Sequence, residues 1–140
     1  MATRNGSAEW RGGLQGGAGD LTVGDGVFKG SYSFASRFEE GEGTNPEELI
    51  AAAHAACLSM ALSSGLAKAG TPAERLNTSA VVTFVPGTGI TKVALTVRGS
   101  VPGLDAESFR AAAEDAKKNC PVSQALAGVP EITLDAQFDS

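Results

Sequence analysis

The sequence predicts an α+β fold, with antiparallel sheets arranged around one long helix. Short strands separated by glycine turns precede a run at residues 49–62 that is apolar nearly all round, and segments in which apolar and polar side chains alternate, as in half-buried strands, follow it. The predicted order is strands, helix, strands, helices, strand, with hairpin-type turns, which does not fit a wound parallel sheet. With 140 residues and 42% hydrophobic content, we expect one domain over residues 1–140.

Three short strands are predicted before the helix, at residues 8–11, 20–23 and 27–34. Glycine turns separate them, and Gly24-Asp25-Gly26 fits a tight reversal, so we expect an antiparallel meander. The glycine pairs lack the GxxxxGK[ST] spacing of a phosphate loop. Residues 35–44 are predicted to form a polar loop.

The long helix is predicted from its start and stop signals. Asn45 fits the N-cap, Pro46 the first helical position, and Glu47 places negative charge at the positive end of the helix dipole. Gly70, followed closely by proline, ends it. Because residues 49–62 are apolar on nearly every side, we expect this helix to be enclosed by protein.

The rest of the chain predicts a hairpin, two helices and a final strand. The pattern indicates strands at residues 79–85 and 91–101, a helix at 105–118 capped by Asp105, a short helix at 121–126, and a strand at 132–138.

Composition excludes several classes of partner. A net charge of −5 without a Lys/Arg cluster argues against nucleic acid and anionic membranes, both of which need a basic surface. We expect no membrane span, because no apolar stretch reaches the roughly 20 residues required. The N-terminus has no apolar signal region, so a cytoplasmic location is expected. In such a protein two cysteines more often serve chemistry or the core than a permanent disulfide.

The two cysteines occupy different environments. Cys57 lies in the middle of the apolar helix, where burial should raise its pKa unless a cation or hydrogen-bond donor compensates. Cys120 precedes Pro121, at the N-cap of the short helix, where free N–H groups favour a thiolate.

Two side chains could compensate the burial of Cys57, and they predict different chemistry. His54, one turn earlier, would act as a base in acyl transfer or proteolysis, but a buried histidine bonded to backbone is the simpler interpretation. Arg37, in the preceding loop, would stabilise a thiolate that attacks a peroxide. A zinc site of Cys57, Cys120 and His54 lacks the usual close ligand pairs. Without thiol chemistry, the cysteines would fill the core, or the protein would carry a small apolar ligand.

Four motifs carry a resemblance to a known family. RFE at residues 37–39, TNPEEL at 44–49, HAAC at 54–57 and CPVS at 120–123 resemble the osmotically inducible protein C and organic hydroperoxide resistance (OsmC/Ohr) family. The place of the arginine shortly before TNPEEL resembles the OsmC branch. In the other branch the arginine lies nearer the N-terminus, which makes Arg11 a rival to Arg37.

The resemblance implies a thiol peroxidase that works as an intertwined homodimer. Carried over residue by residue, Cys57 would be the peroxidatic cysteine, Cys120 the resolving cysteine, Arg37 the cation that stabilises the thiolate, and Glu47 the carboxylate that holds it. The implied substrate is an organic hydroperoxide, and the apolar surroundings of Cys57 favour it over hydrogen peroxide. The implied reductant is an external thiol or dithiol, with lipoyl-type dithiols suggested by relatives, and no metal, flavin or other cofactor is required.

Helix geometry adds a constraint. Glu47 and Cys57 are ten residues apart, about 15 Å along a straight helix and rotated by roughly 80° from facing each other. They cannot touch within one helix. We therefore expect two composite sites at a dimer interface, each combining Cys57 of one chain with Arg37 and Glu47 of the other.

Overall fold

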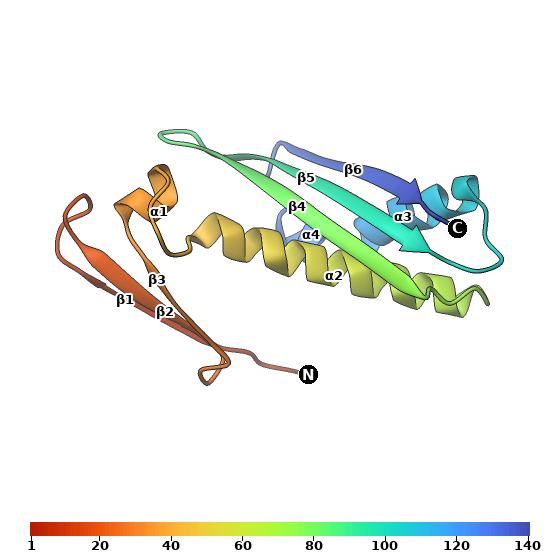
Figure 1. The fold of residues 1–140 in the computed structure, drawn as a ribbon, viewed down its shortest axis with the longest axis horizontal. Helices are drawn as coiled ribbons and strands as arrows, with labels where there is room; N and C mark the ends of the chain where they lie inside the picture. The colour runs from red at the N-terminus through yellow and green to blue at the C-terminus, as the bar shows by residue number, and fades with distance from the viewer. The chain divides into compact units, whose positions relative to one another are not determined.

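The computed structural model describes all 140 residues, which divide into two compact units, Met1–Leu49 and Ile50–Ser140 (Figure 1). The expected order of strands and helices is found, so the α+β prediction is confirmed. The prediction of one domain over residues 1–140 stays a prediction.

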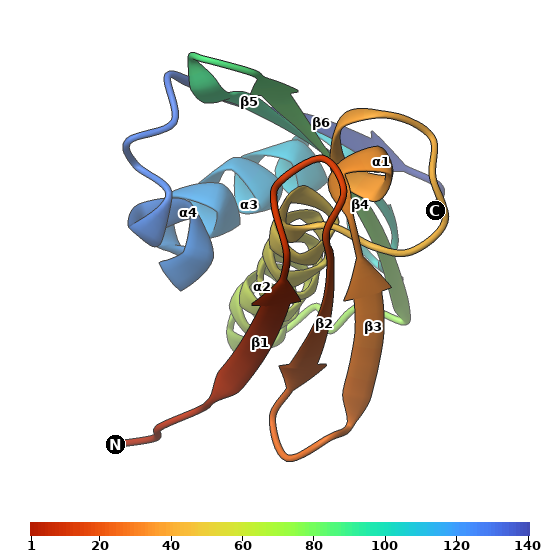
Figure 2. The same ribbon diagram turned by 90° about the vertical axis from the view of Figure 1, so that its left-hand side faces the viewer.

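The first unit is an antiparallel meander followed by a short helix. Its strands are β1 (Gly6–Arg11), β2 (Ala18–Val23) and β3 (Phe28–Tyr32), paired in that order (Figure 2). Gly19 of β2 pairs with both Trp10 and Tyr32, whose rings lie 5.3 Å apart. A Cβ at Gly19 would stand 2.5 Å from the Tyr32 ring, so only glycine lets the two rings meet across the strand.

Residues 35–44 were expected to be a loop, and this prediction is wrong for the first part of the segment. Helix α1 (Phe34–Phe38) is closed by a capping box, in which the side chains of Ser33 and Ser36 each accept the other's backbone N–H. After α1 the chain returns to the sheet through a bridge between Tyr32 and Thr44.

Helix α2 (Pro46–Lys68) begins and ends where predicted. The Asn45 side chain accepts the N–H of Glu48 at 2.8 Å, which confirms the N-cap. At the other end, the N–H groups of Gly70 and Thr71 donate to the carbonyls of Ala67 and Leu66, the paired bonds of a Schellman motif.

One face of α2 is buried and another is open, so the expectation of an enclosed helix is wrong for the single chain. His54, Leu58, Leu62 and Leu66, spaced by four residues, are at most 2% exposed. On the open face lie the exposed side chains Ala52, Ala53, Ala56 and Met60. Met60 is 75% exposed. The apolar side chains of this face are thus not covered by other residues of the same chain.

The premise that no apolar stretch is long enough to span a membrane is wrong for one helix. By length and composition alone α2, with 23 residues, is long and apolar enough to cross a membrane. The core helix of a soluble protein passes the same test.

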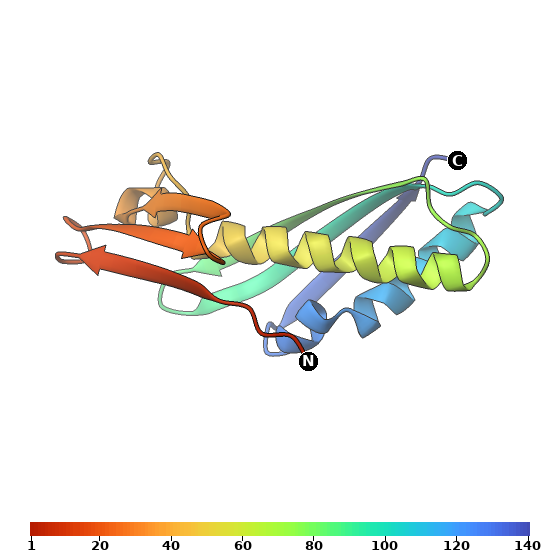
Figure 3. The same ribbon diagram turned by 90° about the horizontal axis from the view of Figure 1, so that it is seen from below.

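The second unit packs helices against one face of a mixed sheet (Figure 3). Strands β4 (Arg75–Val85) and β5 (Gly89–Ser100) form the expected hairpin, and β6 (Glu131–Phe138) pairs with β5 in parallel. The expected all-antiparallel pairing is therefore wrong for β6. The return path runs through α3 (Ala106–Asn119) and α4 (Pro121–Ala125), a crossover of the kind that parallel neighbours require.

The core of this unit joins α2, β5 and α3. It is formed by the leucines of the buried α2 face, by Val93, Leu95 and Val97 of β5, and by Phe109 and Ala113 of α3. This packing fixes the two segments that carry the cysteines, the middle of α2 and the junction of α3 with α4.

Candidate active site

The two cysteines, 63 residues apart in the chain, meet in the second unit. Cys57 projects from the middle of α2, and Cys120 lies where α3 ends and α4 begins. Their Sγ atoms are 3.0 Å apart and both thiols are free. A disulfide has a bond of about 2.05 Å, so a movement of about 1 Å would join them.

Access to the two sulfurs differs. Cys120 is fully buried, whereas Cys57 is half-buried. A small molecule can therefore reach Cys57 but not Cys120.

The pKa values of the two thiols are shifted in opposite directions. Burial raises the pKa of Cys57, contact with Cys120 raises it further, and the Val122 amide only partly offsets these effects. Burial alone would also raise the pKa of Cys120, but hydrogen bonding with Cys57 and with Ser123 lowers it. Within one chain no cation favours the Cys57 thiolate.

The first unit holds a cation already paired with a carboxylate. Arg37 of α1 donates from Nε and Nη2 to the two carboxylate oxygens of Glu47 at 2.9 and 3.0 Å. Glu47 is 8% exposed and Arg37 more open, and the bond to Glu47 raises the pKa of Arg37. The fork-to-fork geometry fixes the plane of the guanidinium and keeps its charge permanent.

The N-cap of α2 helps to place this pair. The Asn45 amide donates to the carbonyl of Ser36 at 2.9 Å while its oxygen caps α2. The Ser36 hydroxyl donates to the carbonyl of Thr44 at 2.7 Å. These bonds tie α1 to the first turn of α2, so that Arg37 and Glu47 face each other.

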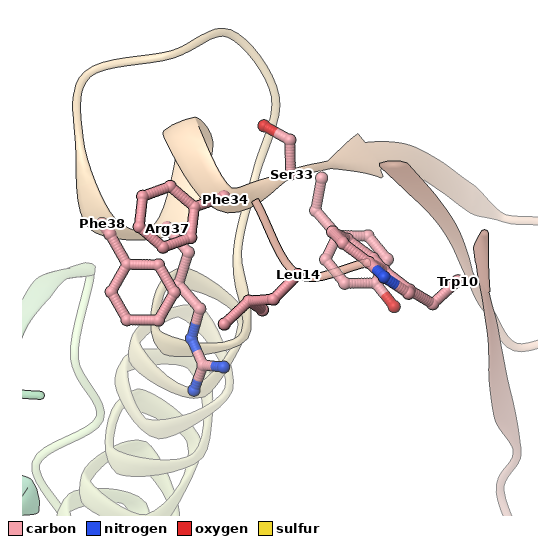
Figure 4. Close-up of a pocket in the computed structure, with 7 residues that line it drawn as sticks. Trp10, Leu14, Ser33, Phe34, Arg37 and Phe38 are labelled. Carbon is pink, nitrogen blue, oxygen red and sulfur yellow. The ribbon is translucent and has the colours of Figure 1, made fainter. Parts of the chain in front are cut away.

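An apolar pocket of about 240 Å³ lies beside Arg37 in the first unit (Figure 4). Its lining is Trp10, Leu14, Tyr32, Ser33, Phe34, Arg37 and Phe38. The rings of Phe34 and Phe38 stack with centroids 4.7 Å apart, and Phe38 lies 5.5 Å from the guanidinium carbon of Arg37. The pocket thus presents one cation among aromatic and aliphatic groups.

Arg11, the rival to Arg37, has other partners. It bonds to Glu9 and Asp20 across β1 and β2, and half of its side chain is exposed. It does not bond to Glu47.

His54 has a partner that the sequence did not reveal. It was expected to bond to backbone, but its Nε2 lies 2.7 Å from the Ser123 hydroxyl, and burial lowers its pKa. The two residues are 69 positions apart, so no sequence signal pairs them. His54 and the two cysteines do not form a three-ligand metal cluster.

Known proteins resemble this chain over most or nearly all of its length. The model of the OsmC-like protein family matches residues 39–135, and Peroxiredoxin OsmC of Escherichia coli (strain K12) is 46% identical over 98% of this chain and 97% of its own. The chain belongs to the OsmC-like family. The resemblance seen in the motifs is therefore confirmed.

One further relative agrees with that assignment, and solved structures share the fold of this OsmC-like chain. An organic hydroperoxide resistance protein from Xanthomonas axonopodis pv. citri (strain 306) is 34% identical, covering 67% of each chain. The crystal structure of an OsmC-like protein from Mycoplasma pneumoniae superposes with a TM-score of 0.77 at 14% identity and 99% coverage of both chains. An organic hydroperoxide resistance protein OsmC from Legionella pneumophila has a TM-score of 0.70 at 24% identity, covering 100% of both chains.

Proposed function

We propose that this protein is a cysteine-based peroxidase that reduces organic hydroperoxides to alcohols. The observation that carries the proposal is the pair of free thiols 3.0 Å apart, one accessible and one buried. Relatives named peroxiredoxin and organic hydroperoxide resistance protein support it.

The first step uses Cys57. Its thiolate attacks the terminal peroxide oxygen, the O–O bond breaks, and the alkoxide leaves and takes up a proton to become the alcohol. Cys57 is then a sulfenic acid. Cys57 has this role, and not Cys120, because peroxide can reach only the half-buried sulfur.

Arg37 of a second chain would supply the cation that Cys57 lacks. Glu47 and Cys57 are ten residues apart on α2, so the pair that Glu47 forms with Arg37 cannot reach Cys57 along the same helix. The open apolar face of α2, with Ala52, Ala53 and Ala56, suits close packing against a second copy. In this homodimer Arg37 would draw the shared negative charge onto Cys57 and stabilise the charge developing on the peroxide oxygens.

The pocket beside Arg37 favours organic substrates. An alkyl or aryl group gains about 25 cal/mol for each Å² of apolar surface removed from water, and the pocket offers aromatic walls next to the guanidinium. Hydrogen peroxide has no group to place there.

The second step uses Cys120. Its thiolate attacks the sulfenic sulfur of Cys57, the S–O bond breaks, and hydroxide leaves as water after protonation. An external thiol or dithiol, for which a lipoyl-type dithiol is our candidate, then returns both thiols. No metal or organic cofactor takes part in either step.

The direct test is peroxide consumption with cumene hydroperoxide and with hydrogen peroxide, using dihydrolipoamide, thioredoxin and glutathione as reductants. We expect turnover, faster with cumene hydroperoxide. Thiol titration after one equivalent of peroxide should show the loss of both thiols. Two intact thiols would instead fit a carrier of apolar ligands or an acyl-transfer enzyme.

Leu14→Asp tests the pocket. A carboxylate at this exposed lining position should lower kcat/KM for cumene hydroperoxide by about tenfold, because one or two buried CH₂ groups are worth about 0.8 kcal/mol each. The value for hydrogen peroxide should stay within about twofold. Val27→Asp, an exposed site outside the pocket, is the matched control. An equal loss for both peroxides in Leu14→Asp would contradict this substrate site.

Cys120→Ser separates the two steps. The first oxidation should proceed at close to the wild-type rate, but the disulfide cannot form and Cys57 should pass to sulfinic acid with excess peroxide. Intact-mass spectrometry after one and ten equivalents of peroxide would detect the added oxygens. An unmodified thiol after both treatments would refute the assignment of roles.

A further inference from the structure

A buried polar pair lies beside the two cysteines and has no part in the steps above. His54 is fully buried, Ser123 is 9% exposed, and His54 Nε2 lies 2.7 Å from Ser123 Oγ. His54 precedes Cys57 by three residues on α2, and Ser123 follows Cys120 by three residues on α4. Helices α2 and α4 are therefore joined at two points, by the sulfur pair and by the His–Ser bond.

The surroundings of His54 select its tautomer. Burial lowers the pKa of His54, so the ring is neutral at pH 7 and carries one proton. Its Nδ1 atom is buried without a hydrogen-bond partner. Orphaned buried N–H groups are rarer in proteins than under-satisfied acceptors, so the proton lies on Nε2 and is donated to Ser123 Oγ.

The Ser123 hydroxyl is then free to donate its own proton. Ser123 is the third residue of α4, a position whose side chain faces back toward the N-cap residue, here Cys120. The Cys120 N–H already donates to the Ala116 carbonyl at 2.8 Å. Cys120 Sγ, at the N-cap of the same helix, is an available acceptor, and Ser123 contributes to the lowered pKa of Cys120.

We propose that His54 and Ser123 are positioning residues for the resolving cysteine, with His54 orienting the Ser123 hydroxyl toward Cys120 Sγ. The inference rests on the proposed peroxidase function. When the Cys120 thiolate attacks the Cys57 sulfenic sulfur, one S–S bond forms, one S–O bond breaks, and hydroxide leaves and takes up a proton from solvent to become water. The hydroxyl stabilises that thiolate and is not consumed.

No charged side chain of this chain acts on Cys120. Lys117 and Lys118 end α3 just before it, but neither alters its pKa, and Asp115 accepts a hydrogen bond from Asn119. The groups that favour the Cys120 thiolate are the Ser123 hydroxyl, the Cys57 sulfur, and the backbone amides of Val122 and Ser123. Apart from Cys57 itself, the hydroxyl is therefore the side-chain donor to Cys120 that mutation can remove.

Ser123→Ala is the first test, with the two steps timed separately from pH 5.5 to 9.5. Cys57 oxidation by one equivalent of cumene hydroperoxide should stay within about twofold of wild type. Disulfide formation, followed by acid quench and mass spectrometry, should slow by about tenfold at pH 7, because a hydrogen bond to a charged group is lost. Its pH midpoint should rise, since the Cys120 thiolate loses a donor.

His54→Gln and His54→Leu test the orienting role. Glutamine can place an N–H donor near the position of Nε2 and should keep the disulfide rate within about threefold, whereas leucine should reproduce Ser123→Ala. Ser63→Ala, an exposed serine on the same helix, is the control. If His54→Leu does not fold, Ser123→Ala still decides the role of the hydroxyl.

Two results would overturn the inference: an unchanged disulfide rate and pH midpoint in Ser123→Ala, or a loss that is equal at every pH, which only a structural role would give. If disulfide formation were as slow in His54→Gln as in His54→Leu, the orienting role of His54 would be contradicted. Failure of the proposed function looks different, because wild-type protein would then form neither sulfenic acid nor disulfide.

Discussion

Cys57→Ser is expected to abolish peroxide reduction. A serine hydroxyl is far less acidic than a thiol and does not form a stable oxidised intermediate, so kcat/KM should fall by on the order of 10³-fold or more, to the uncatalysed rate. The fold should persist, because the change conserves shape at a half-buried position of α2. Steady-state assays with an excess of dithiol would measure the loss.

The matched control for this variant is Cys120→Ser, which removes the other thiol 3.0 Å away. Without a reductant it should still consume at least one equivalent of peroxide for each chain, whereas Cys57→Ser should consume none. Residual consumption by Cys57→Ser that disappears when Cys120 is also changed would reverse the roles of the two cysteines. That result would require peroxide to reach a side chain that is fully buried.

Local signals predicted the helix ends of this protein well. Asn45 and Asp105 cap α2 and α3 as their sequence contexts indicate, because an N-cap bond involves residues only three positions apart. Alternation likewise placed the β4–β5 hairpin. The meeting of Cys57 and Cys120 could not follow from spacing, because it depends on the packing of α2 against the α3–α4 junction, and it was expected only from the family resemblance.

Three features of the structure could not be predicted from local sequence signals. Helix α1 is one turn long, and its capping box uses two serines that read equally well as loop residues. Strand β6 joins β5 in parallel, which its own alternation does not specify. The bond between His54 and Ser123 spans 69 residues, so neither residue identifies the other in the sequence.

Helix α2 is apolar on two faces, and the single chain buries only one of them. Leucines spaced by four residues account for the buried face, and alanines with Met60 make the opposite face apolar as well. The sequence predicted an enclosed helix, and one chain encloses only one side. A second chain over the other side would reconcile the two, and it would also bring an Arg37–Glu47 pair to Cys57.

Arg37→Ala should slow the first oxidation strongly at neutral pH. Removal of a cation within about 4–6 Å raises the pKa of a thiol by about 1–3 units, so the thiolate fraction at pH 7 should fall by about 10- to 10³-fold. The sign is fixed by the charged form, because the thiolate gains from Arg37. The loss is therefore greatest below the wild-type pKa, shrinks as pH rises from the wild-type pKa to the higher pKa of the variant, and vanishes above the latter. Stopped-flow oxidation between pH 5 and 10 would give both midpoints.

Two variants sharpen the test of Arg37. Glu47→Gln keeps the guanidinium but removes the carboxylate that binds it at 2.9 and 3.0 Å, and we expect a smaller loss in the same direction. Arg11→Ala removes an arginine that bonds to Asp20 instead, and the rate should stay within about twofold. If Arg11→Ala were as slow as Arg37→Ala, the assignment of the thiolate-stabilising cation to Arg37 would be contradicted.

Mixing two inactive variants tests whether the site is shared between chains. In a dimer of one Arg37→Ala chain and one Cys57→Ser chain, a site built from both chains combines the intact Cys57 of the first with the intact Arg37 of the second. After full exchange, half of the dimers are mixed and each has one complete site, so about a quarter of the wild-type activity should return. Sites contained within single chains would recover nothing, since each chain lacks one of the two residues. Recovery should also follow the rate of subunit exchange, because complementation requires that the chains first separate and pair anew.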